Sequence, residues 1–176
     1  GLVTGAVPRL GTTAERVAGI RSRRDADPAG TEEQLRTLGE IAESVAALEG
    51  PAPLPKRRRE APQAEREPEN APREALSGGP ASVNRLGALA NQAQATLAGL
   101  GLSTDVLDAA LDLLRRNGAA GAKLSGAGGG GAFFGVFEKK AAAESAAAHL
   151  LEWLVFEGNA LPTGPSVLTM PLYSSN

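Results

Sequence analysis

Apolar residues recur at helical spacing in several separate stretches of this chain, and capping residues flank most of them. Thr12 and Thr31 each stand three residues before a Glu or Gln, which is the spacing of a capping box. Gly50 and the pair Asn117-Gly118 are typical of helix ends. The pattern predicts a turn over 27–30. It predicts helices from Thr12 or Thr13 to about Arg24, Thr31 to Leu48, about Ser82 to Leu100, Ser103 or Thr104 to a C-cap at Asn117-Gly118, and Ala141 to Phe156.

Three further apolar stretches suit strands, namely 2–7, 121–138 and 166–173. The first and last predict single strands, and the middle one predicts a strand, a glycine-rich loop and a second strand. The expected order is one strand, four helices with an insertion, two strands, one helix and a last strand. This irregular alternation favours an α+β fold in which helices cover an antiparallel sheet.

The insertion at 51–80 differs in composition from everything around it, because it holds seven prolines among mostly Arg, Glu and Ala. Such a segment buries little apolar surface, so we expect a surface insertion without regular structure. Its basic run 56–59 (KRRR) resembles a nuclear localisation patch, but five nearby glutamates offset the charge. A solvated loop is the favoured interpretation of this run over a targeting or nucleic-acid signal.

Length and composition describe an ordinary globular domain of 176 residues, with 42% hydrophobic and 22% charged residues. The net charge of -2 gives no reason to expect nucleic acid or an anionic membrane as a partner. The absence of cysteine excludes disulfides, thiolate nucleophiles and cysteine metal sites. No run approaches the ~20 apolar residues of a membrane span. Because the sequence opens at Gly1 in a strand-like stretch, we expect the chain to be a fragment, a processed product or the second half of something larger.

The glycine-rich stretch 123–131 (KLSGAGGGG) is the most informative motif. Glycine lets a backbone approach a ligand closely, and successive exposed N–H groups form a concavity that favours anions. A phosphate-facing loop and a flexible hairpin connection both fit this spacing. A Walker A loop is excluded because no Gly-Lys-Ser/Thr follows, and a Rossmann fingerprint is excluded because a strand rather than a helix follows.

This stretch resembles the third conserved motif of the GHMP kinases, most closely in its mevalonate kinase version. Three other segments match the same family in order: Val7-Pro8-Arg9 with Val17-Ala18-Gly19-Ile20-Arg21, Leu89-Ala90-Asn91 with Leu100-Gly101-Leu102-Ser103, and Gly164-Pro165-Ser166-Val167. The chain departs from the family at Ala93 and Gln94, which replace an Asn and a His. Two extra residues after Arg9 place the family's substrate-side threonine at Thr13, with Thr12 the alternative.

The resemblance implies that residues 1–176 are a GHMP kinase C-terminal (ferredoxin-like) domain with a proline- and charge-rich insertion at 51–80. It also implies the C-terminal half of a cytoplasmic or organellar enzyme that phosphorylates mevalonate for isoprenoid and sterol synthesis. ATP and Mg would be the cofactors, and a missing N-terminal lobe, covalent or associated, would carry the catalytic and metal-binding residues. A homodimer is left open. The implied site residues are Lys123, Ser125, Gly126, Ala127, Gly128, Gly129 and Gly130 toward ATP, and Thr13 toward mevalonate.

Two other functions stay open at this stage. The chain could be a non-catalytic GHMP-like domain that serves as a structural or interaction subunit, or part of another GHMP kinase, such as a phosphomevalonate or homoserine kinase. Individual residues also keep alternatives. Lys123 and Ser125 could be solvated, and Thr13 could cap its helix. We expect the aspartates at 25, 27, 105, 108 and 112 to be solvated or capping, His149 to be structural or exposed, and Trp153 to be in the core.

Overall fold

The computed structural model describes residues 1–48, 80–159 and 167–170. The predicted insertion at 51–80 therefore lies outside the described residues, except for Pro80, which opens a helix. In chain order the elements are β1 (Leu2–Val7), α1 (Thr13–Ala26), α2 (Pro28–Leu48), α3 (Pro80–Gly99), α4 (Asp105–Arg116), β2 (Gly121–Leu124), β3 (Gly131–Val136), α5 (Lys140–Phe156) and β4 (Val167–Met170).

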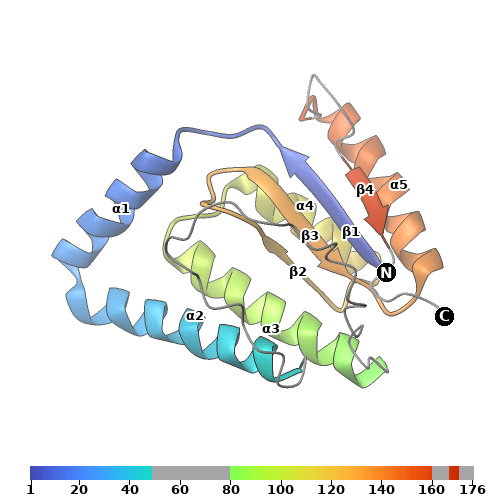
Figure 1. The fold of residues 1–176 in the computed structure, drawn as a ribbon. Coiled ribbons are helices and arrows are strands. Elements are labelled where there is room, and N and C mark those ends of the chain that lie inside the picture. Colours follow the sequence, from blue (N-terminus) through green and yellow to red (C-terminus); the bar gives the residue numbers. More distant parts are fainter. Residues whose placement is uncertain (49–79, 160–166, 171–176) are drawn as a thin grey trace, which may run out of the picture.

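The four strands form one antiparallel sheet in the order β2-β3-β1-β4. Val3 on β1 lies opposite Gly135 on β3 and Thr169 on β4, and Lys123 on β2 lies opposite Phe134 on β3. Together with α4 and α5 as the two connecting helices, this order is the ferredoxin-like arrangement. The predicted α+β fold with an antiparallel sheet covered by helices is confirmed (Figure 1).

The main core lies between one face of the sheet and the pair α4 and α5. Inward positions alternate along β1, where Val3 and Val7 are buried while Thr4 and Ala6 are half-buried. Phe133 from β3 and Leu124 from β2 lie on the same face. Helices α4 and α5 contribute the larger share of the leucines, Leu107, Leu111, Leu114, Leu150 and Leu154. Trp153, expected in the core, is partly buried at the edge of this cluster.

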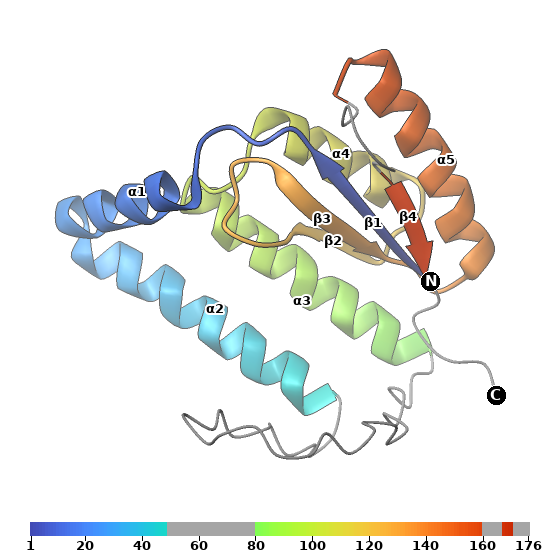
Figure 2. The same cartoon turned by 45° about the horizontal axis from the view of Figure 1, so that its top comes forward.

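Helices α1, α2 and α3 form a long excursion between β1 and α4 (Figures 1 and 2). Helix α3 lies along the outer edge of β2, and the two backbones touch at a pair of glycines. A Cβ added at Gly87 would lie 2.4 Å from the carbonyl carbon of Ala120, and one added at Gly121 would lie 1.9 Å from the Gly87 oxygen. Any larger residue at either position would push the helix away from the strand.

The start of α2 differs from the prediction. The capping box expected at Thr31 and Gln34 is wrong, since α2 begins at Pro28 and Thr31 is a buried position inside it. The predicted turn over 27–30 is instead the helix start, because Asp27 accepts a hydrogen bond from Gly30 N (3.0 Å) and proline suits a first helical position. The capping-box spacing predicted Thr31 as the cap, but Asp27, four residues earlier, accepts the hydrogen bond from the first turn of the helix.

The other predicted helix starts agree with the structure to within a few residues. Thr12 caps α1 with a complete capping box to Glu15, and Thr104 caps α4. Of the predicted last strand 166–173, Val167–Met170 forms β4, and the other predicted positions lie outside the described residues. Within the described residues, none of the helices combines the length and apolar character that crossing a membrane would require.

Candidate functional site

The glycine-rich loop joins β2 to β3 at the end of the sheet that lies toward α1 (Figure 1). Gly126, Gly128, Gly129, Gly130 and Gly131 all have positive φ, between 72° and 97°. This backbone conformation is open to glycine and strained for other residues. The loop therefore has a defined, glycine-dependent shape rather than that of a generic hairpin connection.

Two of the glycines are required by close contacts as well as by φ. A Cβ at Gly128 would lie 2.3 Å from the carbonyl oxygen of Leu102, and one at Gly130 would lie 2.2 Å from that of Pro8. In contrast, a Cβ at Gly126 would meet nothing within 4 Å. The first two positions pack against the protein, whereas Gly126 faces open space.

Hydrogen bonds hold the loop at three points and leave part of it free. Gly129 N donates to Leu102 O (2.8 Å), Leu10 N donates to Gly129 O (2.7 Å), and Ser125 N donates to Ala132 O (2.8 Å). Within the part of the chain that the structure describes, the N–H groups of Gly126, Ala127, Gly128 and Gly130 donate to no backbone oxygen outside the regular helices and strands. Unpaired donors in a positive-φ loop are the chemistry of an anion-binding nest.

Two arginines that the sequence reasoning did not assign to the site lie against this loop. Arg16, on the first turns of α1, donates from Nη2 to Leu10 O, and its buried Nε has no hydrogen-bond partner. That Nε lies 2.3 Å from where a Cβ of Gly129 would be. Arg9 approaches Gly131, where its Nε would lie 3.5 Å from an added Cβ. Both bring positive charge to the free amides, and Arg9 could have been found from its place in the Val7-Pro8-Arg9 motif.

The two threonines at the start of α1 have different roles. Thr12 Oγ1 accepts from Glu15 N (3.2 Å), and Glu15 Oε2 accepts from Thr12 N (2.6 Å), so Thr12 is the helix cap. These bonds also lower the pKa of Glu15 below its usual range. Thr13 is therefore not needed as a cap, and its Oγ1 accepts a hydrogen bond from Arg9 Nη2 (3.2 Å). Arg9 and Thr13 form a small exposed polar cluster near the glycine loop.

Lys123 lies just before the loop but its amine points to the side of α2 and α3. Its Nζ donates to Leu124 O (2.7 Å) and lies 5.3 Å from the centroid of the Phe134 ring. Burial lowers the pKa of Lys123 from its ordinary value. Of the predicted site residues, Ser125 to Gly130 are gathered in the loop and Thr13 lies at the start of α1, while Lys123 occupies a separate, more apolar environment.

Several acidic residues are engaged in local structure. Asp27 accepts from Gly30 N, Asp108 accepts from Ser103 Oγ (2.6 Å), and Asp112 pairs with Arg115 (2.7 Å). His149 is exposed, with Nδ1 2.8 Å from Asn117 Oδ1. Across residues 1–48, 80–159 and 167–170, no three His, Asp or Glu side chains group as metal ligands would.

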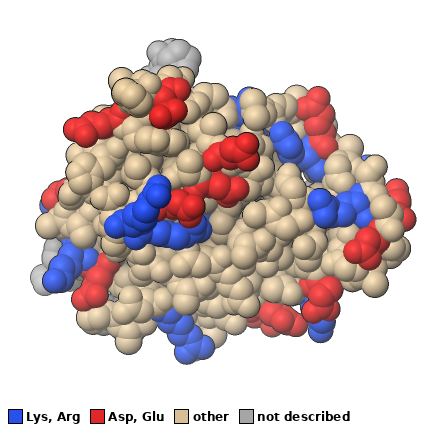
Figure 3. All heavy atoms as spheres, turned by 180° about the vertical axis from the view of Figure 1, so that it is seen from behind, with Lys and Arg blue, Asp and Glu red and all other residues tan. Residues whose placement is uncertain are grey.

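Charges of both signs are mixed on the face of the described residues that is seen from behind (Figure 3). Figure 3 shows acidic and basic side chains interspersed over the face seen from behind, with large uncharged areas between them. Among the described residues, Arg24–Glu32 and Lys140–Glu144 form exposed ion pairs. The mixed face lacks the continuous basic surface that favours nucleic-acid binding.

Comparisons with known proteins agree with this geometry. The family model described as GHMP kinases C terminal matches residues 80–155, from the start of α3 into α5. Among solved structures, L. major mevalonate kinase in complex with R-mevalonate is similar over 86% of this chain and 37% of its own, with a TM-score of 0.62 and 21% identity. Methanococcus jannaschii mevalonate kinase is similar over 88% and 35%, with a TM-score of 0.53 and 22% identity.

A third solved structure, the Lin0012 protein from Listeria innocua, is similar over 87% of this chain and 36% of its own, with a TM-score of 0.63 and 16% identity. The comparison with curated proteins found no match. This chain thus spans little more than a third of the length of the structures it resembles, and at these identities the likeness establishes the fold. The family match over residues 80–155, the ferredoxin-like sheet and the glycine-rich loop together make this chain similar to the C-terminal domain of GHMP kinases.

Proposed function

We propose that this chain is the C-terminal lobe of a mevalonate kinase and that its glycine loop binds ATP phosphates during phosphorylation of mevalonate. The observation that carries the proposal is the set of free N–H groups at Gly126, Ala127, Gly128 and Gly130 beside Arg9 and Arg16. Two of the similar solved structures are mevalonate kinases, one of them with R-mevalonate. Their low identity leaves the substrate itself as part of the proposal.

The chemistry assigned to the loop is positioning and charge stabilisation. Phosphoryl transfer breaks the bond from the γ-phosphorus to the bridging oxygen, which leaves with ADP, and forms a bond to the 5-hydroxyl oxygen of mevalonate. Loop amides and the Ser125 hydroxyl would donate hydrogen bonds to phosphate oxygens. The Lys123 amine, which points toward α2 and α3, is not assigned to the phosphates. Arg9 and Thr13 would offer polar contacts to the substrate at the same end of the sheet.

The remaining groups of the reaction are proposed to lie outside this chain. The base that takes the hydroxyl proton and the carboxylates that hold Mg²⁺ belong, in this proposal, to an N-terminal lobe, covalent or associated. When bound, the metal would neutralise phosphate charge. The short span relative to the similar structures supports this division. A cytoplasmic location is part of the same proposal.

The test uses the native polypeptide that carries this chain, whose intact mass first shows whether further residues precede Gly1. It is incubated with Mg-ATP and mevalonate, and ADP and phosphomevalonate are measured by mass spectrometry. Phosphomevalonate and homoserine are assayed in parallel, so turnover of either alone would assign another GHMP kinase. A folded two-lobe protein with no turnover of any of the three would overturn the proposal and favour a non-catalytic structural or interaction subunit.

A matched pair of variants links turnover to the loop. Gly128→Ala places a Cβ against Leu102 O within the loop, whereas Gly118→Ala, at a similar positive φ after α4 and outside the loop, places one in open space. We expect the first to lose activity far more than the second. Equal activity of the two variants would contradict a phosphate-binding role that depends on this loop shape.

A further inference from the structure

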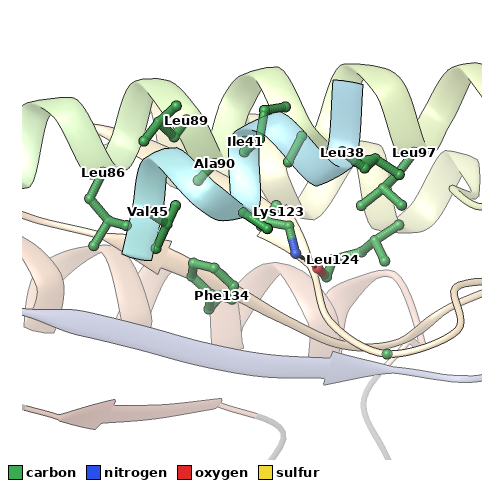
Figure 4. A pocket seen from close by; sticks show the side chains of 13 residues that line it. Leu38, Ile41, Val45, Leu86, Leu89, Ala90, Leu97, Lys123, Leu124 and Phe134 are labelled. Carbon is green, nitrogen blue, oxygen red and sulfur yellow. Dashed lines mark hydrogen bonds between the residues drawn. The ribbon is translucent and has the colours of Figure 1, made fainter. Parts of the chain in front are cut away.

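A cavity of about 470 Å³ lies between α2, α3 and the β2–β3 side of the sheet (Figure 4). Figure 4 shows Ile41 and Val45 from α2 and Leu86 from α3 directed toward it, with the ring of Phe134 at its base. The lining is otherwise made mainly of Leu and Ala side chains. A cavity of this size and composition lies in the range that holds small apolar ligands.

One charged group faces this apolar lining, the amine of Lys123. Its Nζ has an intramolecular hydrogen bond to Leu124 O and lies over Phe134, and an ammonium can donate three hydrogen bonds. Within the described ranges, no acidic side chain forms an ion pair with it. Burial without a counter-charge lowers the pKa of this amine, so an anion placed beside it would relieve an existing cost.

We propose that this cavity binds an amphiphile whose apolar chain lies between α2 and α3 and whose anionic head pairs with Lys123. The apolar lining provides favourable burial for a hydrocarbon chain. The single amine fixes which end of the ligand lies at β2 and selects a negative head group. This site is separate from the phosphate-binding role proposed for the free amides of the glycine loop, although Gly126 lies at the boundary of the two.

The ligand class is tested by titrating the native polypeptide that carries this chain with decanoate, decyl phosphate, decanol and decyltrimethylammonium below their micelle concentrations. Isothermal calorimetry gives affinity and stoichiometry, and methyl NMR signals of Ile41 and Leu86 report the location. We expect decanoate and decyl phosphate to bind once per chain and about tenfold more tightly than decanol, and the cation not to bind. Equal affinity for decanol and decanoate, or no saturable binding of either anion, would overturn the proposal.

Two pairs of variants separate the charge from the cavity. Lys123→Met keeps an apolar side chain and removes the charge, so decanoate affinity should fall about tenfold while decanol affinity stays the same. Lys140→Met, at an exposed position on α5, is the control. Ala42→Trp places a ring at the exposed rim of the cavity and should abolish binding, whereas Ala46→Trp, one turn further along α2, should not. Unchanged decanoate binding in both Lys123→Met and Ala42→Trp would contradict the site.

Discussion

The side chain of Gln94 accepts the backbone hydrogen bond that Leu124 would otherwise donate to a neighbouring strand. Its Oε1 accepts a hydrogen bond from the Leu124 backbone N–H at 2.9 Å, and the glutamine is only 4% exposed. Its Nε2 donates to Ser103 Oγ (3.1 Å) and Asp108 Oδ1 (3.2 Å). A single buried amide on α3 thus joins the edge strand to the start of α4.

Side chains also form hydrogen bonds with other backbone groups along the outer edge of β2. Asn91 Oδ1 accepts from Ala122 N (3.1 Å), Asn91 Nδ2 donates to Ala120 O (3.2 Å), and Arg115 Nη2 donates to Ala122 O (2.8 Å). An unprotected sheet edge would expose these groups for pairing with another chain. Because β2 leads directly into the glycine loop, these side chains also fix where the loop begins.

Replacing Gln94 with Ala should destabilise the fold by about 2 kcal/mol, because it leaves the buried Leu124 N–H and the Ser103–Asp108 pair without their partner. Urea unfolding gives the free energy of unfolding. Gln92→Ala, on the exposed side of the same helix, is the matched control and should change stability by less than about 0.5 kcal/mol. Equal effects of the two substitutions would show that the edge contact contributes nothing.

The approach of α3 to β2 predicts opposite effects for two helical glycines. Gly87→Ala should destabilise by about 2 kcal/mol, because its Cβ would overlap the Ala120 backbone. Gly39→Ala on α2 has open space around it and should stabilise by about 1 kcal/mol through helix propensity. Thermal and urea unfolding of both variants check the signs. Stabilisation by Gly87→Ala would mean that the helix lies further from the strand.

Much of this fold follows from local patterns in the sequence. The strands at Leu2–Val7 and Gly131–Val136 and the cap at Thr12 were predictable, because alternation, turn residues and capping spacing are local signals. The resemblance to a known family supplied the sheet connectivity, which no local pattern carries. Asp27 and Thr31 are both residues that can cap a helix, and Asp27, directly before Pro28, is the one at which α2 starts.

The candidate site was only partly predictable for a related reason. A run of glycines indicates a loop with unusual backbone angles, so residues 125–130 could be predicted as a site from the sequence. The partners of that loop come from elsewhere in the chain, and nothing local marks Arg16 as lying against Gly129. Gln94 likewise appeared only as a departure from the family pattern, whereas its contact with Leu124 joins residues 30 positions apart.

Arg16 should control how firmly the glycine loop is held. Its guanidinium binds Leu10 O, and Leu10 N in turn binds Gly129 O, so its loss should loosen both connections. In Arg16→Met we expect the Gly129 amide to exchange with solvent about tenfold faster, the effect of losing roughly 1.4 kcal/mol of local stability. Arg21→Met, exposed on the same helix, is the control, and similar exchange rates in both variants would contradict the role of Arg16.

Lys123 should make stability depend on pH in the alkaline range. Burial lowers its pKa in the folded chain below the ordinary value of 10.5. At pH values below the folded pKa both states are protonated, and the full cost of burying the charge is present. Between the folded pKa and 10.5 the unfolded state holds more protons, so the free energy of unfolding rises with pH through that window.

The measurement compares the native chain with Lys123→Met by urea unfolding from pH 7 to 10.5, because other titrating groups then cancel in the difference. We expect the native chain to gain stability relative to Lys123→Met as pH rises. Lys140→Met, which removes a lysine from an exposed position, gives the baseline for losing one amine. A flat or falling difference for Lys123→Met would mean that the amine is solvated in the folded chain, and it would also remove the electrostatic argument for an anionic head group in the adjoining cavity.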